Sequence, residues 1–265
     1  MGELELKARI STAYQEGKSE HLDARNGNGG KAAADRALSH YQSSIDASRD
    51  LYGGELRDDA LRAAYRAGLL EHARANVGLQ QVMGLTPPSG SRPDPASIRS
   101  GLERAAAHFQ SARLAADGSR HPDVGAHLQY ASMQVDLGRL ANRTGDYGAR
   151  VALQDGEIHV TSPVLEAFQL GAQAALDAQS VQQDLVGRPQ VRGAPEPMDP
   201  AQFQAALSTT TQSLAFERQQ AIMNLNQGLL ASFESLQGSG VLPPQMDSAQ
   251  WMGLVSAWTA ARLVE

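Results

Sequence analysis

The sequence predicts an all-α protein. Of its 265 residues 42% are hydrophobic but only 5% are aromatic, and much of the apolar content is alanine. Alanine and glutamine, both frequent here, favour helix because they lose little side-chain freedom in it. The residues that strands prefer are scarce, and apolar residues recur at helical spacing over several long windows. We therefore expect about seven or eight helices.

Two helices are predicted before residue 80. In the first, from about 31 to 51, Ala34, Leu38, Tyr41 and Ile45 share one stripe. The second runs from about 56 to 79, and its stripe consists of Leu61, Ala64, Tyr65, Leu69, Ala73 and Val77. A pair of glycines between them, at positions 53 and 54, is typical of a helix end.

The middle of the chain predicts two more helices. Asp94 and Pro95 form a cap and first-turn pair for a helix whose stripe contains Ile98, Leu102, Ala105, Phe109 and Ala112. The next helix begins after Asp123 and ends before Gly145.

The following segment, 151–161, fits no helix, and a short extended piece is expected at 157–160. Ser162 and Pro163 then begin a helix that reaches about residue 185. The proline-rich segment 187–200 is predicted to be a linker. We expect a helical-repeat region over 1–158 and a helical region over 159–265 that packs on it.

The carboxy-terminal third predicts a long helix and a short one. The long helix covers 203–236, or is two helices broken near Phe216. The short one covers 248–264 and places Trp251 and Trp258 seven residues apart on one stripe. This spacing favours a core position, while the alternative is an exposed surface for self-association through the C-terminal helices. Charges are sparse from residue 199 onward.

An internal echo links two of these helices. Residues 37–43, Ala-Leu-Ser-His-Tyr-Gln-Ser, recur at an offset of 68 as residues 105–111, Ala-Ala-Ala-His-Phe-Gln-Ser. Downstream, Ala75 and Asn76 match Ala141 and Asn142 at an offset of 66. An echo that spans a whole helix pair is typical of helical repeats.

These residues resemble the tetratricopeptide repeat over roughly 30–150. The family's second-helix pattern of small, aromatic and small residues resembles Ala37, Tyr41, Ser44, Ala105, Phe109 and Ala112. Its first-helix pattern resembles Leu137, Gly138 and Ala141, and the run 121–124 is similar to the linking element of the kinesin light chain type. One departure is that Glu71 stands where the family has glycine.

The resemblance implies a right-handed superhelix of antiparallel helical hairpins, a TPR-like α-solenoid, with extra C-terminal helices. It also implies a non-enzymatic protein-interaction module that holds a peptide or helix of a partner protein in a concave groove. The positions carried over as partner-binding residues are Tyr65, His72, Asn76, Arg139, Asn142 and Arg143. The family's carboxylate clamp is not reproduced, so a chaperone tail is not expected as ligand.

Catalytic chemistry is the weaker interpretation, and no cofactor is expected. His121, Asp123 and His127 are competent metal ligands and suggest, as the rival, a metal-dependent helical hydrolase. Their spacing fits a linker and helix cap better, because His121 precedes the helix that contains His127. No serine has the glycine pattern of a nucleophile elbow.

Composition limits the remaining classes. A net charge of −6 argues against a general nucleic-acid surface, and no run of about 18 apolar residues predicts a membrane span. The charged residues within 1–14 exclude a cleavable secretory signal. We therefore expect a cytoplasmic protein. We also expect a bacterial origin, because the Ala, Arg and Gln content suits a high-GC genome. A bacterial effector or secretion accessory, exported without a cleavable signal, stays an alternative.

Overall fold

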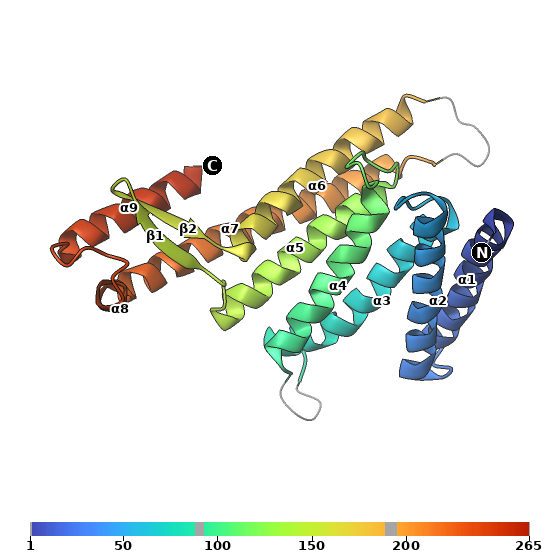
Figure 1. The fold of residues 1–265 in the computed structure, drawn as a ribbon, viewed down its shortest axis with the longest axis horizontal. Coiled ribbons are helices and arrows are strands. Elements are labelled where there is room, and N and C mark those ends of the chain that lie inside the picture. Colours follow the sequence, from blue (N-terminus) through green and yellow to red (C-terminus); the bar gives the residue numbers. More distant parts are fainter. Residues whose placement is uncertain (1, 88–92, 189–194, 265) are drawn as a thin grey trace.

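The computed structural model describes residues 2–87, 93–188 and 195–264. The elements are α1 (Glu3–Arg25), α2 (Gly30–Leu51), α3 (Asp59–Val82), α4 (Pro95–Arg113), α5 (Val124–Thr144), β1 (Arg150–Gln154), β2 (Glu157–Thr161), α6 (Pro163–Val186), α7 (Pro200–Ala231), α8 (Phe233–Gly238) and α9 (Ser248–Val264). Helices dominate and pack against their neighbours in the chain, so the helical class is confirmed, with one β-hairpin added (Figure 1).

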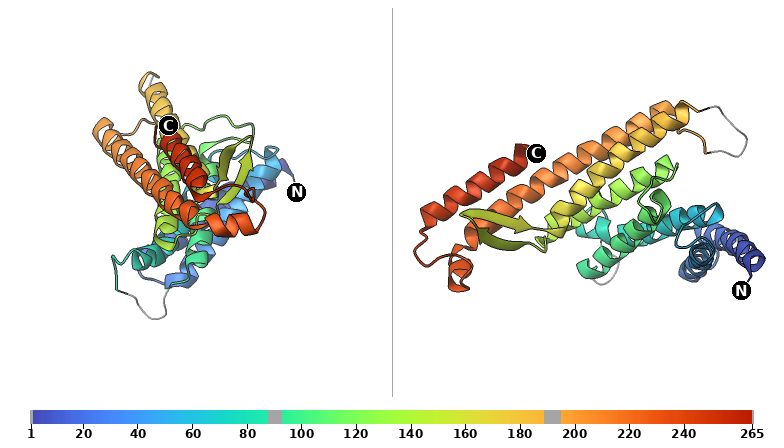
Figure 2. Two further views of the ribbon diagram at one scale, coloured as in Figure 1. Left: turned by 90° about the vertical axis from the view of Figure 1, so that its left-hand side faces the viewer. Right: turned by 45° about the horizontal axis from the view of Figure 1, so that its top comes forward.

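Three helical hairpins form the amino-terminal two thirds of the molecule. α1 packs most extensively on α2, α3 on α4, and α5 on α6. Successive hairpins also touch, through α2 with α3 and α4 with α5, and α7 then packs on both α5 and α6. The helices therefore follow one another across the molecule, from the N-terminus at one end to α9, which begins at the other end and runs back toward the middle (Figure 2).

A glycine on the first helix of each hairpin faces an aromatic ring on the second. The three pairs are Gly17 with Tyr41, Gly68 with Phe109, and Gly138 with Phe168. The approach is closest in the third pair, where a Cβ on Gly138 would lie 2.3 Å from Cζ of Phe168. All three rings are buried. The two helices of each hairpin can approach this closely only because the glycine has no side chain.

These contacts correct the repeat alignment made from the sequence. Glu71 was expected to occupy the glycine position of the α3 pattern, but Gly68 is the residue that faces the aromatic ring. Gly68 and Gly138 are therefore equivalent, and the echo between Ala75 and Ala141 does not align the two helices. Ala75 lies seven residues after Gly68 in α3, whereas Ala141 lies three residues after Gly138 in α5. The two alanines are therefore not at equivalent positions.

The charged amino-terminal segment forms α1, a helix that the sequence analysis did not predict. Its backbone begins with a capping interaction, in which the Gly2 N–H donates to Oε2 of Glu5 at 2.8 Å. Leu6, Ile10 and Tyr14 form its buried stripe. Charged residues surround this stripe on the other faces, which masked the apolar pattern.

The extended piece expected at 157–160 is one strand of a β-hairpin. β1 and β2 pair antiparallel with Val151 opposite Val160, and the residues that connect them, Asp155 and Gly156, have φ of 52° and 79°. Two such residues form the tight turn that right-twisted strands prefer. This hairpin is inserted between α5 and α6, and β2 packs on α9.

The predicted region boundary at 158–159 falls inside β2. α6, which lies beyond this boundary, pairs with α5. Within the predicted linker 187–200, residues 189–194 lie outside the described residues. At its described end, Gln182 of α6 exchanges two hydrogen bonds with the backbone of Met198, at 2.7 and 2.9 Å.

α7 continues unbroken through Phe216, where a break was one of two alternatives. Leu214, Glu217 and Ala221 continue its buried stripe across this point. The helix ends at Ala231, and the short α8 turns the chain so that α9 packs back on α7. Among the described helices, none has the length and apolarity needed to cross a membrane.

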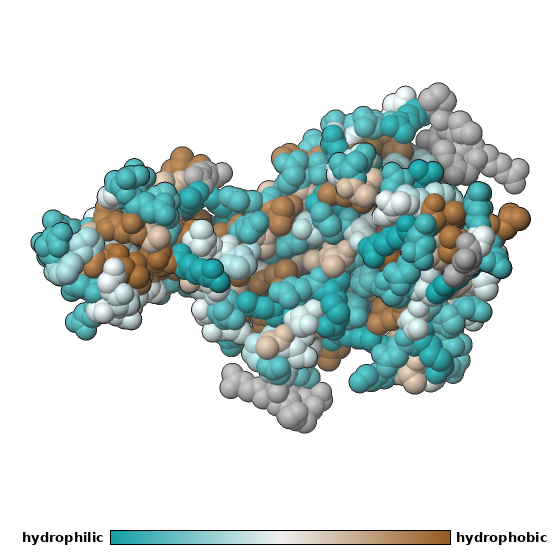
Figure 3. All heavy atoms as spheres, viewed as in Figure 1, coloured by the Kyte–Doolittle hydropathy of each residue, from teal (hydrophilic) through white to brown (hydrophobic). Residues whose placement is uncertain are grey.

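Both tryptophans of α9 are buried, with exposed fractions of 1% for Trp251 and 7% for Trp258. The indole N–H of Trp251 donates to the Leu229 carbonyl of α7 at 2.9 Å. The core position is thus confirmed for this pair. In Figure 3 apolar residues gather at this end of the molecule, over the β-hairpin and α9.

The glycine–aromatic contacts generate a first prediction. Gly138→Ala should lower the free energy of unfolding, because overpacking of about 1–3 kcal/mol exceeds the gain of about 1 kcal/mol in helix propensity. Gly253→Ala in α9 is the matched control, since a Cβ there meets nothing within 4 Å. Urea unfolding should show destabilisation for the first variant and a small stabilisation for the second. Equal stability of the two variants would contradict the close approach.

Candidate functional site

The six residues predicted to bind a partner lie on α3 and α5, the first helices of two hairpins. Three of them, His72, Arg139 and Asn142, belong to one polar network that reaches α7. Nε2 of His72 lies 3.1 Å from Oδ2 of Asp136, and Arg139 donates to Oδ1 of the same carboxylate at 3.1 Å. This part of the network joins α3 to α5.

Glu217 of α7 continues the network. Its carboxylate accepts hydrogen bonds from Nε of Arg139 at 3.2 Å and from Nδ2 of Asn142 at 2.8 Å. The Tyr147 hydroxyl donates to Oδ1 of Asn142 at 2.9 Å and accepts from Asn224 of α7 at 2.7 Å. Glu217 is only 8% exposed. The predicted groove beside Arg139 is therefore occupied by the protein's own α7.

The other three predicted residues have separate surroundings. Tyr65 packs its ring edge-on against Phe109 with 5.7 Å between centroids, and burial raises the pKa of its hydroxyl. Arg143 is exposed and donates to the Val82 carbonyl at the end of α3 at 3.1 Å. Asn76 is half-buried on α3. Most of the predicted surface thus takes part in contacts between the hairpins.

The residues of the proposed metal site have structural roles. Oδ1 of Asp123 accepts from the Ala126 N–H at 3.0 Å, which confirms the helix-cap interpretation. His127 is fully buried, and its Nε2 lies 3.1 Å from the His121 carbonyl oxygen. Burial lowers the pKa of His127 to about 4. In the part of the chain that the structure describes, no group of three or more His, Asp or Glu side chains could hold a metal ion.

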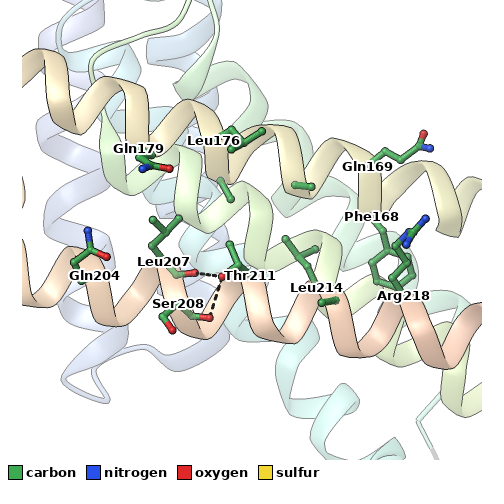
Figure 4. Close-up of a pocket in the computed structure, with 13 residues that line it drawn as sticks. Phe168, Gln169, Leu176, Gln179, Gln204, Leu207, Ser208, Thr211, Leu214 and Arg218 are labelled. Atoms are coloured by element: carbon green, nitrogen blue, oxygen red, sulfur yellow. Dashed lines mark hydrogen bonds between the residues drawn. The ribbon is translucent and has the colours of Figure 1, made fainter. Parts of the chain in front are cut away.

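A groove between α6 and α7 is a site that the sequence analysis did not find. It has a volume of about 690 Å³, and Figure 4 shows Leu207 and Leu214 of α7 pointing from one wall toward α6. Its lining residues are Phe168, Gln169, Ala172, Ala175, Leu176, Gln179, Gln204, Leu207, Ser208, Thr211, Leu214, Ala215 and Arg218. Leu176 is 60% exposed at its rim.

The groove is almost uncharged. Its only charged lining residue is Arg218 at one end, although 20% of the chain is charged. The hydroxyl of Thr211 donates to the Leu207 carbonyl at 2.9 Å, and the Ser208 hydroxyl accepts from Gln212 at 3.2 Å. These hydroxyl groups already have partners within α7, so the amides of Gln169, Gln179 and Gln204 are the main polar groups that a bound ligand would meet.

The groove lies where α7 packs less extensively on α6 than on α5. In the preceding hairpins the order is reversed, since α5 packs mainly on α4 and little on α3. The carboxy-terminal half of α7 is covered by α9, where Asn226 donates to the Thr259 hydroxyl at 2.6 Å. α9 is displaced along α7 toward that end (Figure 2). The amino-terminal half of α7 packs on α5 and α6, where Phe203 lies in one buried cluster with Val124 and Val181.

Comparisons with known proteins found no match to this chain, whether against family models, curated proteins or solved structures.

The buried network generates a second prediction. Glu217→Ala should lower the free energy of unfolding by about 2 kcal/mol, because the Asn142 amide and the Arg139 guanidinium lose a buried carboxylate that accepts from both. Glu234→Ala, on exposed α8, is the control and should change stability by less than about 0.5 kcal/mol. Urea unfolding at pH 7 measures both. A loss below about 1 kcal/mol for Glu217→Ala would show that α7 is not held by this carboxylate.

His127 generates a prediction about pH. Its pKa is about 4 in the folded protein against an ordinary value of 6.5, so between these values the unfolded chain binds a proton that the folded chain does not. The free energy of unfolding should therefore fall from pH 6.5 to pH 4, by about 3 kcal/mol from this residue. Urea unfolding across this range should give a weaker pH dependence for His127→Gln. The same change at exposed His159 should leave the wild-type dependence intact.

Proposed function

We propose that the protein is a non-enzymatic interaction module, a TPR-like α-solenoid, which binds a helix of a partner protein. The repeated pairing of a small residue with an aromatic ring supports the relationship to tetratricopeptide repeats. It recurs in α1–α2, α3–α4 and α5–α6, where it sets the close packing on which such a right-handed superhelix depends.

The observation that carries the proposal is the almost uncharged groove between α6 and α7. Amphipathic helices bind grooves of this kind through apolar residues spaced three and four apart. The α6 wall offers Ala172 and Leu176, and the α7 wall offers Leu207 and Leu214. We favour this groove over the first-helix surface around Arg139 and Asn142, because the internal network with Glu217 occupies that surface.

The test is a site-specific cross-link in the full chain. A photoreactive amino acid at Leu176, in the groove, should cross-link a defined partner in cells that express the protein. The same residue at Leu4 of α1, which is 83% exposed, is the control for random contacts. Untagged protein, added as a competitor, should reduce this cross-linking. An untagged competitor that carries Leu176→Glu should compete at least tenfold more weakly, because its binding would bury a carboxylate.

Two results would contradict this function. Equal cross-linking from Leu4 and Leu176 would mean that the groove does not select a partner. Equal competition by wild type and by folded Leu176→Glu, with urea unfolding confirming the fold, would place any partner elsewhere on the surface.

A further inference from the structure

A second groove lies at the carboxy-terminal end of α5, where α7 extends past that end (Figure 1). The groove has a volume of about 790 Å³ and shares no lining residue with the α6–α7 groove. One wall is the segment that leads from α5 into β1, with Gly148, Ala149 and Val151. The other wall is the carboxy-terminal half of α7, with Gln227 and Gly228. We call this the β1–α7 groove.

The outer edge of β1 borders this groove with its backbone. The hairpin closes through Gln154 and Glu157 on either side of a two-residue turn, so this pair exchanges hydrogen bonds and the pairs alternate from there. The N–H and C=O groups of Val151 and Leu153 therefore point away from β2. In the described part of the chain β1 pairs with no strand except β2. Since Val151 lines the groove, unpaired backbone groups of a strand are available there.

The α7 wall leaves room for another main chain. A Cβ on Gly228 would meet nothing within 4 Å. Gln227 is exposed, and its amide has no hydrogen-bond partner among the described residues. A primary amide both donates and accepts, as a peptide group does. A chain that lies on β1 can therefore pair with Gln227 on its other side.

Charge contributes little to this groove. Of the described residues that line it, only Asp146 is charged, and its carboxylate lies 3.0 Å from Nη2 of Arg99. The Asn224 amide in the α7 wall donates to the Tyr147 hydroxyl at 2.7 Å. The groups left for a ligand are neutral, namely the backbone of β1 and the Gln227 amide. An occupant would therefore be recognised mainly through its main chain.

A main chain can pair with β1 only when it is extended. Within a helix the N–H and C=O groups bond to one another, so a helix offers no backbone partners to a strand edge. A strand has outward N–H and C=O groups at every second residue, which is the spacing of Val151 and Leu153. Addition of a strand to an open sheet edge is a recurring mode of peptide recognition.

We propose that the β1–α7 groove binds an extended segment of a partner protein, which adds to β1 as a third strand. Leu225 and Leu229 line the groove and are buried, so apolar residues at every second position of the segment would contact them. A second copy of this chain fits less well, because its β1 would bring β2 along into the space beside α7. The site uses no residue of the α6–α7 groove and is therefore independent of the proposed function.

The test selects eight-residue linear peptides from a random phage-displayed library on the full chain. Phage that bind Gly228→Leu are removed first, because the leucine would fill the groove from the α7 wall. The fold should be kept, since a Cβ at this position meets no other atom and leucine favours helix over glycine. Gly253→Leu in α9 is the matched control, because a Cβ there also meets nothing within 4 Å.

We expect a selected peptide to bind wild type and Gly253→Leu equally. It should bind Gly228→Leu at least about tenfold more weakly, measured by fluorescence anisotropy. Leu176→Glu should leave this affinity unchanged, because it alters the other groove. Urea unfolding of each variant separates a binding effect from a loss of fold.

Two further readouts identify strand addition. Bound peptide should slow amide hydrogen exchange at Val151 and Leu153 by at least about tenfold, while Ala152, which already pairs with His159 of β2, should change less. The peptide is also made with N-methyl groups on its odd or on its even residues. The version methylated on the edge that meets β1 should bind at least about tenfold more weakly, because it lacks the N–H donors.

Four results would overturn the inference. One is failure to select any peptide that distinguishes wild type from Gly228→Leu, and another is unchanged exchange at Val151 in the complex. Loss of binding in folded Leu176→Glu would place the peptide in the α6–α7 groove. A concentration-dependent dimer that Gly228→Leu abolishes would make a second copy the occupant. The cross-link from Leu176 tests the proposed function separately from all four.

Discussion

The rest of the structure depends on the contact between a backbone and an aromatic ring inside each hairpin. Because Gly68 has no side chain, Phe109 lies directly on the backbone of α3, and the same holds for Gly138 and Phe168. This contact sets the separation of the two helices, and the separation sets where the next hairpin can pack. Alanine on neighbouring turns, such as Ala64 and Ala105, both fully buried, keeps the helices close along their length. The low aromatic content of the chain is therefore sufficient, since a few buried rings sit where the packing needs bulk.

The sequence was sufficient to predict most helices but not the register between them. Helix boundaries follow from local signals such as Asp94 with Pro95 and the positive-φ Gly145, and these predictions agree with α4 and α5. The predicted alignment of the repeats was wrong at Glu71, because the identity of a residue does not reveal which side of a helix faces the partner helix. The β-hairpin was detectable, since Asp155 and Gly156 form a typical two-residue turn between alternating apolar residues.

The candidate site was harder to predict for a different physical reason. Arg139 and Asn142 were correctly placed on a first helix, but their partner Glu217 lies far along the chain, and no local pattern links an arginine to a distant carboxylate. The α6–α7 groove was hidden in the same way, since its walls come from two helices whose facing residues are distant in the sequence. The one feature of the sequence that relates to the groove is the scarcity of charge in the last third of the chain. A buried helix has the same feature, so it does not predict a groove.

The position of the two tryptophans has an experimental consequence. They are the only tryptophans in the chain, and both lie on α9, where Trp251 is held against Leu229 of α7. Tryptophan fluorescence therefore reports the docking of one terminal helix, while far-ultraviolet circular dichroism reports all helices together. A comparison of the two signals can therefore distinguish cooperative unfolding from detachment of α9 alone.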